Sequence, residues 1–473
     1  MDKTKLITKI TSLPPGVADL ITPVSIYLRI RDKFPNAILL ESSDYHGNRN
    51  SKTYICFDIM ANFKVEDGKI SKSYVDGSIH TASIRDENTL VNELNDFLNS
   101  FDIENNEKLG KEIANGLFGY TSYDAIQYLE TIKFRDKKNK DTKIPQVNYS
   151  LYRFVLSFNH FNNQLYLLEN LTESTSTRKD EVNAILADRT VGQFNFQMAN
   201  EEYSNISDER FMEMVSSGKD HCKKGNVFQV VLSRQFSREF KGDEFNVYRS
   251  LRSINPSPYL FYFDYGGFKI FGSSPEAQVV IEDNVARINP IAGTFKRTGD
   301  DEKDRELAIK LSKDEKENAE HVMLVDLARN DLGRNSNIVD VNTFREVQFY
   351  SHVIHLVSMV TGDLAPDYKA YKIFGDSFPA GTLSGAPKFR AMELIDELES
   401  RNRGYYGGAL GYIGFNGEMN HAIMIRSFLS KNNKLFYEGG AGVTAASVEE
   451  NELIEVNNKL GALRQALNQA EKI

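Results

Sequence analysis

The sequence predicts a large mixed fold of the α/β class, of the antiparallel-rich α+β type. First, short runs of β-branched and aromatic residues, closed by Gly, Pro or Asn, are intermixed with amphipathic helical patterns over 473 residues. Second, the chain has neither the regular strand–helix alternation nor the GxGxxG turn of a dinucleotide-binding sheet. Third, 41% hydrophobic and 26% charged residues are enough for a sizeable packed core.

The order of the predicted elements follows from local patterns. Seven segments have strand composition: 37–42, 154–158, 164–170, 226–236, 258–265, 278–283 and 434–442. Four have helical spacing: 208–225, capped by Ser207 and stopped by Gly225; 315–333; 384–398, with Pro387 in its first turn; and 449–467. Three polar stretches are predicted to be solvated loops or exposed helix faces: 134–143, 169–181 and 296–306.

Composition excludes several classes of protein. A net charge of −9 and a pI near 5.6 argue against a broad nucleic-acid-binding surface. Two cysteines, Cys56 and Cys222, are too few for a disulfide framework or a structural zinc site. The N-terminal residues resemble neither a signal peptide nor a transit peptide, and no window of 18 apolar residues occurs. We therefore expect a cytoplasmic protein with no membrane span.

Two pairs of glutamates stand out on predicted helices. Glu317 and Glu320 are three residues apart, as are Glu452 and Glu455, so each pair shares one helix face. Two such pairs facing each other would suit Mg²⁺, which prefers oxygen ligands. Acidic pairs of this spacing are also common on solvated helix surfaces. The apolar run after His321 favours burial of the first pair, and both interpretations stay open on spacing alone.

Glycine-rich segments form a second candidate site. They cover 378–387, 404–414 and 438–447, where backbone N–H groups can approach an anion closely, although glycines also simply mark turns. Arg426 is predicted to lie on an otherwise apolar strand, where it is either paired or binds a carboxylate. His352 and His355 are candidates for catalysis or for satisfied core histidines.

Six motifs in a fixed order resemble a known family. They are PIAGT (290–294), KENAEHVMLVDLARNDLGR (316–334), SHVIHLVS (351–358), FPAGTLSGAPK (378–388), GYYGGALGYIG (404–414) and EGGAGVTA (438–445). Together they resemble the chorismate-utilising enzymes, and most closely the anthranilate synthase component I members. The likeness extends upstream to LLESSD (39–44) and so covers almost the whole chain.

The resemblance implies the architecture and the roles of the candidate residues. It implies a β-sandwich of two orthogonally packed sheets surrounded by helices, with a regulatory part at 1–200 and a catalytic part at 201–473 within one intertwined fold. It assigns Mg²⁺ to Glu317, Glu320, Glu452 and Glu455. It assigns catalysis to His355, beside the departing 4-hydroxyl, to Glu276, an acid/base carboxylate, and to Thr382. It assigns substrate binding to Gly293, Thr294, Tyr406, Arg426, Gly440, Ala441 and Gly442.

Two positions select among the members of this family. Aminodeoxychorismate synthases usually carry a nucleophilic lysine where this chain has Ala292, and isochorismate and salicylate synthases carry a water-activating lysine where it has Gln229. Both residues therefore indicate that ammonia adds to chorismate, giving anthranilate and pyruvate in tryptophan biosynthesis. The alternatives are an aminodeoxychorismate synthase component I and a non-catalytic tryptophan-sensing subunit.

The resemblance also implies regulation and a partner. Glu41, Ser42 and Lys52, with Pro258, Tyr259 and Leu260, match the site of feedback inhibition by tryptophan, although 39–42 is also a plausible core strand. The chain ends at Ile473 without a cysteine suited to glutamine hydrolysis, so we expect a separate glutaminase subunit in a hetero-oligomer. Ala446, Glu449 and Asn226 depart from the usual motifs and leave the local loop shape open.

Overall fold

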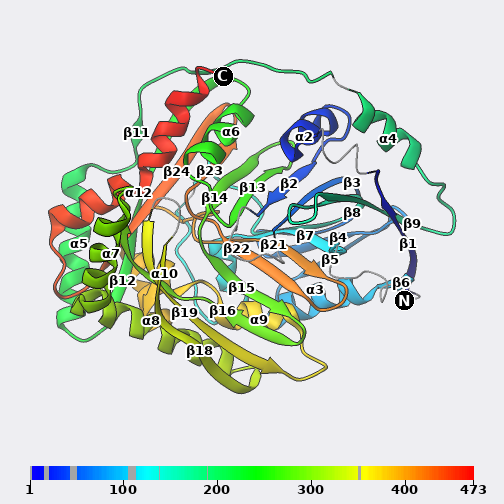
Figure 1. Cartoon of the computed structure of the whole chain (residues 1–473). Helices are drawn as coiled ribbons and strands as arrows, with labels where there is room; N and C mark the ends of the chain where they lie inside the picture. Colours follow the sequence, from blue (N-terminus) through cyan, green and yellow to red (C-terminus); the bar gives the residue numbers. More distant parts are fainter. Residues whose placement is uncertain are drawn as a thin grey trace.

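The computed structural model describes residues 3–14, 21–42, 51–104, 113–137, 139–188, 190–349 and 353–473, with side chains except those of Thr294 and Lys316. Two long antiparallel strands, β3 (Lys52–Glu66) and β8 (Val147–Asn159), organise the fold. One half of this strand pair belongs to a first sheet and the other half to a second sheet. Strands cross the centre of the molecule, and most helices lie outside them (Figure 1).

The first sheet is antiparallel except for its β6–β1 edge. In spatial order its strands are β6 (Phe101–Glu104), β1 (Thr4–Ser12), β9 (Gln164–Leu171), β8, β3, β2 (Ile38–Glu41), β13 (Tyr259–Asp264), β14 (Lys269–Ser274), β23 (Ser427–Lys431), β24 (Lys434–Val443) and β12 (Gln229–Gly242). Three short strands pair with β12: β10 (Phe196–Met198), β11 (Tyr203–Ser204) and β20 (Gly385–Ala386).

The second sheet grows from the other half of β3 and β8. Its strands are β5 (Ile79–Ser83), β4 (Lys69–Ser73), β3, β8, β7 (Gly116–Thr121), β21 (Ala409–Gly414), β22 (Met419–Ile423), β15 (Ala277–Glu282), β16 (Val285–Ile288), β19 (Val353–Leu364) and β18 (Ser336–Phe349). Strand β17 (Ile291–Lys296) also pairs with β19.

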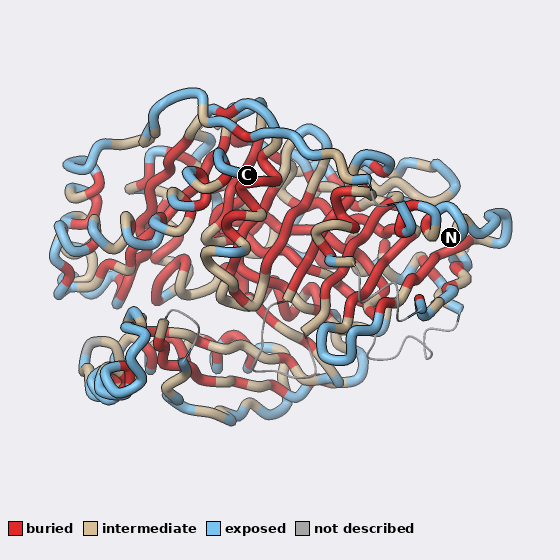
Figure 2. The backbone as a smooth tube through the Cα atoms, turned by 45° about the horizontal axis from the view of Figure 1, so that its top comes forward, coloured by how far each residue is buried: buried red, intermediate tan, exposed pale blue. Residues whose placement is uncertain are grey.

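An irregularity in β3 marks the corner between the sheets. Its register with β8 shifts between Ile59 and Ala61, directly after Asp58, whose φ is +65°. A bulge of this kind bends a strand, so one strand can serve two layers. Tyr54 and Tyr152, from β3 and β8, join one apolar cluster with Phe118 of β7 and Phe261 of β13. This cluster joins residues of both layers, and Figure 2 shows that the backbone in the middle of the molecule is mostly buried.

Helices cover the outer faces of the sheets. They are α2 (Pro23–Arg31), α3 (Thr89–Asn99), the 3₁₀ helix η2 (Tyr123–Tyr128), α4 (Lys179–Ala187), α5 (Asp208–Lys223), α6 (Phe245–Ile254), α7 (Asp301–Lys313), α8 (Glu315–Gly333), α9 (Ala370–Ser377), α10 (Gly381–Ser384), α11 (Lys388–Leu398) and α12 (Glu449–Ala470). In the part of the chain that the structure describes, none of them is long and apolar enough to cross a membrane.

The predicted fold class is confirmed: the chain forms a mixed, mainly antiparallel sandwich of two sheets with helices outside. The seven predicted strands correspond to β2, β8, β9, β12, β13, β15 and β24, although β8 and β12 are longer than expected. The predicted helices at 208–225, 315–333 and 449–467 are α5, α8 and α12. Strands from both predicted parts pair with each other, as β2 does with β13 and β7 with β21. The division into a regulatory and a catalytic part stays a prediction.

Two local predictions were wrong. The helix expected from 384 begins only at Lys388, because Gly385 and Ala386 pair with β12 and Pro387 is the N-cap. Arg426 is not on a strand: it lies between β22 and β23 with φ +49°, a backbone conformation that a regular strand cannot contain. His352 lies outside the described residues.

Candidate active site

Helix α8 positions the first glutamate pair. Asp314 caps the helix by accepting a hydrogen bond from the backbone N–H of Glu317, which places the pair in the first two turns. The side-chain amide of Gln229, from β12, donates a 2.9 Å hydrogen bond to Oε1 of Glu320. The carboxylate of Glu317, the other member of this pair, lies beside Gly293. A Cβ added at Gly293 would be 3.2 Å from Oε2 of Glu317. Both acids therefore face strands rather than open solvent.

Helix α12 positions the second pair. Glu452 is only 4% exposed, whereas Glu455 is about half exposed and forms a 2.7 Å ion pair with Lys459, one turn later. The ammonium of Lys459 also donates to the carbonyl of Gly440 at 2.9 Å. Lys459 thus connects the acidic face of α12 to the glycine-rich strand β24.

The chemistry of these donors fits Mg²⁺, because all four side chains offer hard carboxylate oxygens and no sulfur or imidazole ligand accompanies them. Within the described residues, however, no three acidic, histidine or cysteine side chains lie together as a group that would hold a metal ion. The structure gives each pair a common face and does not bring the two pairs into one cluster. The assignment of magnesium to Glu317, Glu320, Glu452 and Glu455 stays a prediction.

Glu276, Thr382 and Arg426 form the electrostatic centre of the site. The hydroxyl of Thr382 donates to the carboxylate of Glu276, at 3.1 Å from Oε1 and 3.3 Å from Oε2. Burial raises the pKa of Glu276 to about 7, and the Thr382 hydrogen bond and the Arg426 charge limit the rise. Burial also lowers the pKa of Arg426, whose guanidinium makes no hydrogen bond among the described residues. A carboxyl group that titrates near neutrality is suited to proton transfer.

His355 lies on β19 opposite Thr294 of β17. Its Nδ1 is 2.8 Å from the carbonyl oxygen of Gly293, so Nδ1 carries the proton and donates it. Burial lowers the pKa of His355 to about 4, and the Arg426 charge acts in the same direction. Gly293 has φ +67°, which favours glycine, and a Cβ there would be 2.7 Å from Leu311 Cδ1. The side chain of Thr294 lies outside the described residues.

A glycine-rich stretch of β24 forms one wall. Gly440, Ala441 and Gly442 pair with Ser233, Leu232 and Val231 of β12. A Cβ at Gly440 would lie 3.2 Å from the hydroxyl of Tyr406, and one at Gly442 would lie 2.5 Å from Gln229 Nε2. Tyr406 is buried, which raises its pKa to about 12, so its hydroxyl remains a hydrogen-bond donor near neutral pH. This wall therefore lets a ligand approach the backbone of β24 closely and offers it the hydroxyl of Tyr406.

The predicted inhibitor residues meet where β2, β3 and β13 are neighbours. Glu41 is 3% exposed and pairs across the sheet with Leu260 and Thr53. Ser42 donates its backbone N–H to the carbonyl of Lys52 at 3.1 Å. Tyr259 lies next to Leu260 on β13, and Pro258 precedes that strand. The six residues thus occupy one region of the first sheet.

Sequence reasoning missed the side chains that bind the carboxylates of Glu41, Glu320 and Glu455. Arg252 binds Glu41 with both Nε and Nη2, at 2.9–3.1 Å, and Tyr248 donates its hydroxyl to the same carboxylate. The helical spacing of Glu455 and Lys459 could have indicated their ion pair. No local signal pointed to the contact between Gln229 and Glu320, because 91 residues separate them.

A comparison with protein families adds a decisive observation. The model of a family described as chorismate binding enzyme matches residues 36–465. This chain belongs to the chorismate binding enzyme family. The matched span contains every candidate catalytic, metal and substrate residue, as well as the six predicted inhibitor residues.

Individual members of the family resemble the chain over most of its length. Anthranilate synthase component 1 of Aquifex aeolicus is 36% identical over 479 residues, covering 96% of this chain and 94% of the relative. The protein of the same name from Acetivibrio thermocellus is 40% identical over 378 residues, covering 76% of each. The crystal structure of anthranilate synthase component I from Streptococcus pneumoniae is 32% identical, with a TM-score of 0.75, and covers 87% of this chain and 92% of that one.

The departure at Glu449 has a structural explanation. Glu449 begins α12, and its carboxylate accepts hydrogen bonds from Lys219 at 2.9 Å and from Ser216 at 2.7 Å, both on α5. These bonds lower the pKa of Glu449 to about 2, so the carboxylate is ionised at neutral pH. An acid at this position therefore fixes the start of the helix that carries Glu452 and Glu455.

Proposed function

We propose that this chain is the aminase component of an anthranilate synthase, which converts chorismate and ammonia to anthranilate and pyruvate. The observation that carries the proposal is the near full-length likeness to proteins named anthranilate synthase component 1. Glu276, Thr382, Arg426 and His355, which the resemblance assigned to this chemistry, are linked through hydrogen bonds and charge in the site, and this supports the proposal.

Recognition of chorismate starts from its two carboxylates. Arg426 and the hydroxyl of Tyr406, with the glycine-rich backbone of β24, bind the enolpyruvyl carboxylate. Glu317, Glu320, Glu452 and Glu455 are the residues that would hold Mg²⁺, which would bind the ring carboxylate. When bound, this ion supplies positive charge that positions the carboxylate and stabilises charge as hydroxide departs. An acidic protein needs such cationic groups to hold a dianion.

The reaction proceeds by addition and two eliminations. Ammonia forms a C–N bond at C2 of the ring while the C4–O bond breaks, and the departing hydroxide becomes water with the proton that the new C2 ammonium group releases. His355, held by the Gly293 carbonyl, lies at the departing hydroxyl and orients it. Glu276 then removes the C2 proton, the enolpyruvyl C–O bond breaks, and pyruvate leaves as the ring becomes aromatic. A positioned acid/base group contributes about 10²–10⁴-fold to such steps.

Two side chains favour this outcome over the related reactions. Ala292 is 6% exposed and has only a methyl group, so it offers no nucleophile in place of ammonia. Gln229 occupies the position of a water-activating lysine, and its amide is engaged with Glu320. An amide cannot act as a base near neutral pH.

Ammonia comes from a partner glutaminase subunit, so the working enzyme is a hetero-oligomer, and the isolated chain uses free ammonia. Tryptophan inhibits it by binding at Glu41, Ser42, Lys52, Pro258, Tyr259 and Leu260, a site separate from the catalytic one. The reaction belongs to the lyase class and takes place in the cytoplasm.

Anthranilate fluorescence tests the proposal directly. Purified chain is mixed with chorismate, ammonium and Mg²⁺ at mildly alkaline pH, and we expect fluorescent product that disappears when Mg²⁺ is chelated. Chorismate left unconsumed at every ammonium concentration would instead indicate a sensing subunit. Formation of aminodeoxychorismate would assign the chain to the related synthase. Ala292→Lys protein is the matched variant for the choice of nucleophile.

A further inference from the structure

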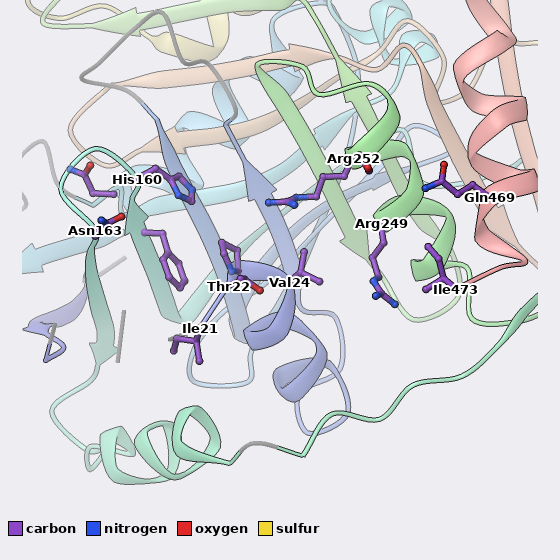
Figure 3. Close-up of a pocket in the computed structure, with 13 residues that line it drawn as sticks. Ile21, Thr22, Val24, His160, Asn163, Arg249, Arg252, Gln469 and Ile473 are labelled. Carbon is purple, nitrogen blue, oxygen red and sulfur yellow. The ribbon is translucent and has the colours of Figure 1, made fainter. Parts of the chain in front are cut away.

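A cavity lined by none of the proposed catalytic residues lies between helices α2, α6 and α12 (Figure 3). Its volume is about 600 Å³, within the range of small-molecule sites. The start of α2, the end of α12, helix α6 and the turn between β8 and β9 surround it. Its lining residues are Ile21, Thr22, Pro23, Val24, Phe158, Asn159, His160, Asn163, Arg249, Arg252, Ser253, Gln469 and Ile473. None of them is a candidate catalytic, metal or inhibitor residue.

Two arginines, Arg249 and Arg252, carry the side-chain charge at this cavity, and Arg252 is already ion-paired with Glu41. Arg249 and Arg252 are three residues apart on α6, so they share a helix face, and both side chains line the cavity. No aspartate or glutamate is among the lining residues. Arg249 donates to the neutral side chain of Asn246 at 3.1 Å, and among the described residues no carboxylate pairs with it. A guanidinium whose charge is unmatched attracts an anion.

Neutral polar groups and apolar groups complete the lining. Asn159, Asn163 and Thr22 offer hydrogen bonds, while Ile21, Val24 and Phe158 offer apolar surface. Phe158, which is largely buried, stacks on His160, with their ring centroids 6.2 Å apart. Arginines and apolar side chains in one lining match an amphipathic ligand rather than a bare inorganic ion.

We propose that this cavity binds a small organic anion, with a carboxylate or phosphate head group at Arg249 and Arg252 and an apolar body against Phe158 and Val24. A planar guanidinium binds both head groups with paired hydrogen bonds. The guanidinium of Arg252 also donates hydrogen bonds to Glu41. The ligand therefore binds mainly to Arg249, and Arg252 interacts with both Glu41 and the ligand. The site is independent of the proposed catalytic function, because no group of the catalytic set contributes to it.

Titration calorimetry on the full chain tests the site with two probes, benzoate and phenyl phosphate, and with the neutral benzyl alcohol as a reference. We expect the anions to bind and the alcohol not to bind, and the tighter anion identifies the head group. Arg249→Gln should weaken binding about tenfold, the loss expected for one charge-assisted hydrogen bond. Arg210→Gln, at an exposed arginine paired with Glu213 on α5, is the matched control and should bind as the unaltered chain does.

A second variant separates loss of the site from loss of the fold. Ser253 is exposed at the rim of the cavity, so Ser253→Trp fills space without removing either arginine, and it should weaken binding as well. Both variants should keep the anthranilate-forming rate and the thermal midpoint of the unaltered chain. The proposal is overturned if neither anion binds, or if both bind Arg249→Gln and Ser253→Trp as tightly as the unaltered chain.

Discussion

At the scale of single residues, Glu276 combines burial with contacts that favour its charged form. Burial raises its pKa to about 7, while the Thr382 hydroxyl and the Arg426 charge act against the rise. A base must be ionised, so kcat/KM should fall as the pH drops through about 7. Thr382→Val removes one stabilising hydrogen bond, so the pKa rises and the acidic limb of the pH profile moves to higher pH. Thr382→Ser keeps the hydroxyl and should leave the limb in place. An unmoved limb in Thr382→Val protein would contradict this account.

Glu276→Gln separates the chemical role of this residue from its structural role. The amide cannot remove the C2 proton, so kcat should fall by about 10²–10³-fold. The folded-state pKa is raised, so the protonated side chain favours folding at low pH, and this contribution is lost as the pH rises through about 7. At pH 8 the Glu276→Gln protein, which is uncharged at this position, should therefore unfold at the same temperature as the unaltered chain or at a higher one. Calorimetric melting at pH 5 and pH 8 measures this, and a large drop in melting temperature at pH 8 would be inconsistent with it.

Single residues also mark the limit of sequence prediction. The glutamate pairs could be recognised because three-residue spacing places two side chains on one helix face. The contact between Thr382 and Glu276 could not, because the two residues are 106 positions apart and meet only after both layers have formed. Arg426 was expected on a strand from its apolar neighbours, but its positive φ depends on the turn between β22 and β23.

At the scale of elements, the packing of β24 against β12 affects the orientation of Glu320 on α8. Gly442→Ala would place a Cβ 2.5 Å from Gln229 Nε2, the movable end of that side chain, which would swing away from Glu320. We expect the fold to be retained and the Mg²⁺ concentration for half-maximal activity to rise several-fold, because the carboxylate is no longer oriented. Gln229→Ala should give the same effect, and the double variant should add nothing more. Additive effects in the double variant would show that the two residues act separately.

Helix starts were predicted correctly where a capping residue marks them locally. Ser207 caps α5 and Asp314 caps α8, and these signals lie within the helices' own sequences. The start of α11 depends instead on Gly385 and Ala386, which pair with β12 more than 150 residues earlier in the chain. Local pattern therefore fixes helix boundaries only where no distant strand competes for the same residues.

At the scale of the whole molecule, continuous strand pairing connects the predicted inhibitor region to the catalytic region. Glu41 of β2 pairs with Leu260 of β13, and Leu260 also pairs with Ser273 of β14. Strand β14 ends at Ser274, whose hydroxyl lies 3.4 Å from the backbone nitrogen of Glu276. A ligand that moves β2 against β13 would therefore act on the chain segment that carries Glu276, the proposed catalytic carboxylate. A functional measurement of inhibition tests this coupling.

Glu41→Gln provides that measurement. The amide oxygen can still accept hydrogen bonds from Tyr248 and Arg252, but the side chain loses the charge that would bind the ammonium group of tryptophan. We expect the tryptophan concentration for half-inhibition to rise at least about tenfold, with kcat unchanged when tryptophan is absent. Glu244→Gln is the matched control, because Glu244 is equally buried and ion-paired, with Lys269, yet lies outside the predicted site. Tryptophan inhibition is measured for the unaltered chain, Glu41→Gln and Glu244→Gln. Equal sensitivity to tryptophan in all three proteins would place the tryptophan site elsewhere. Loss of sensitivity in Glu41→Gln protein alone would assign inhibition to the end of β2.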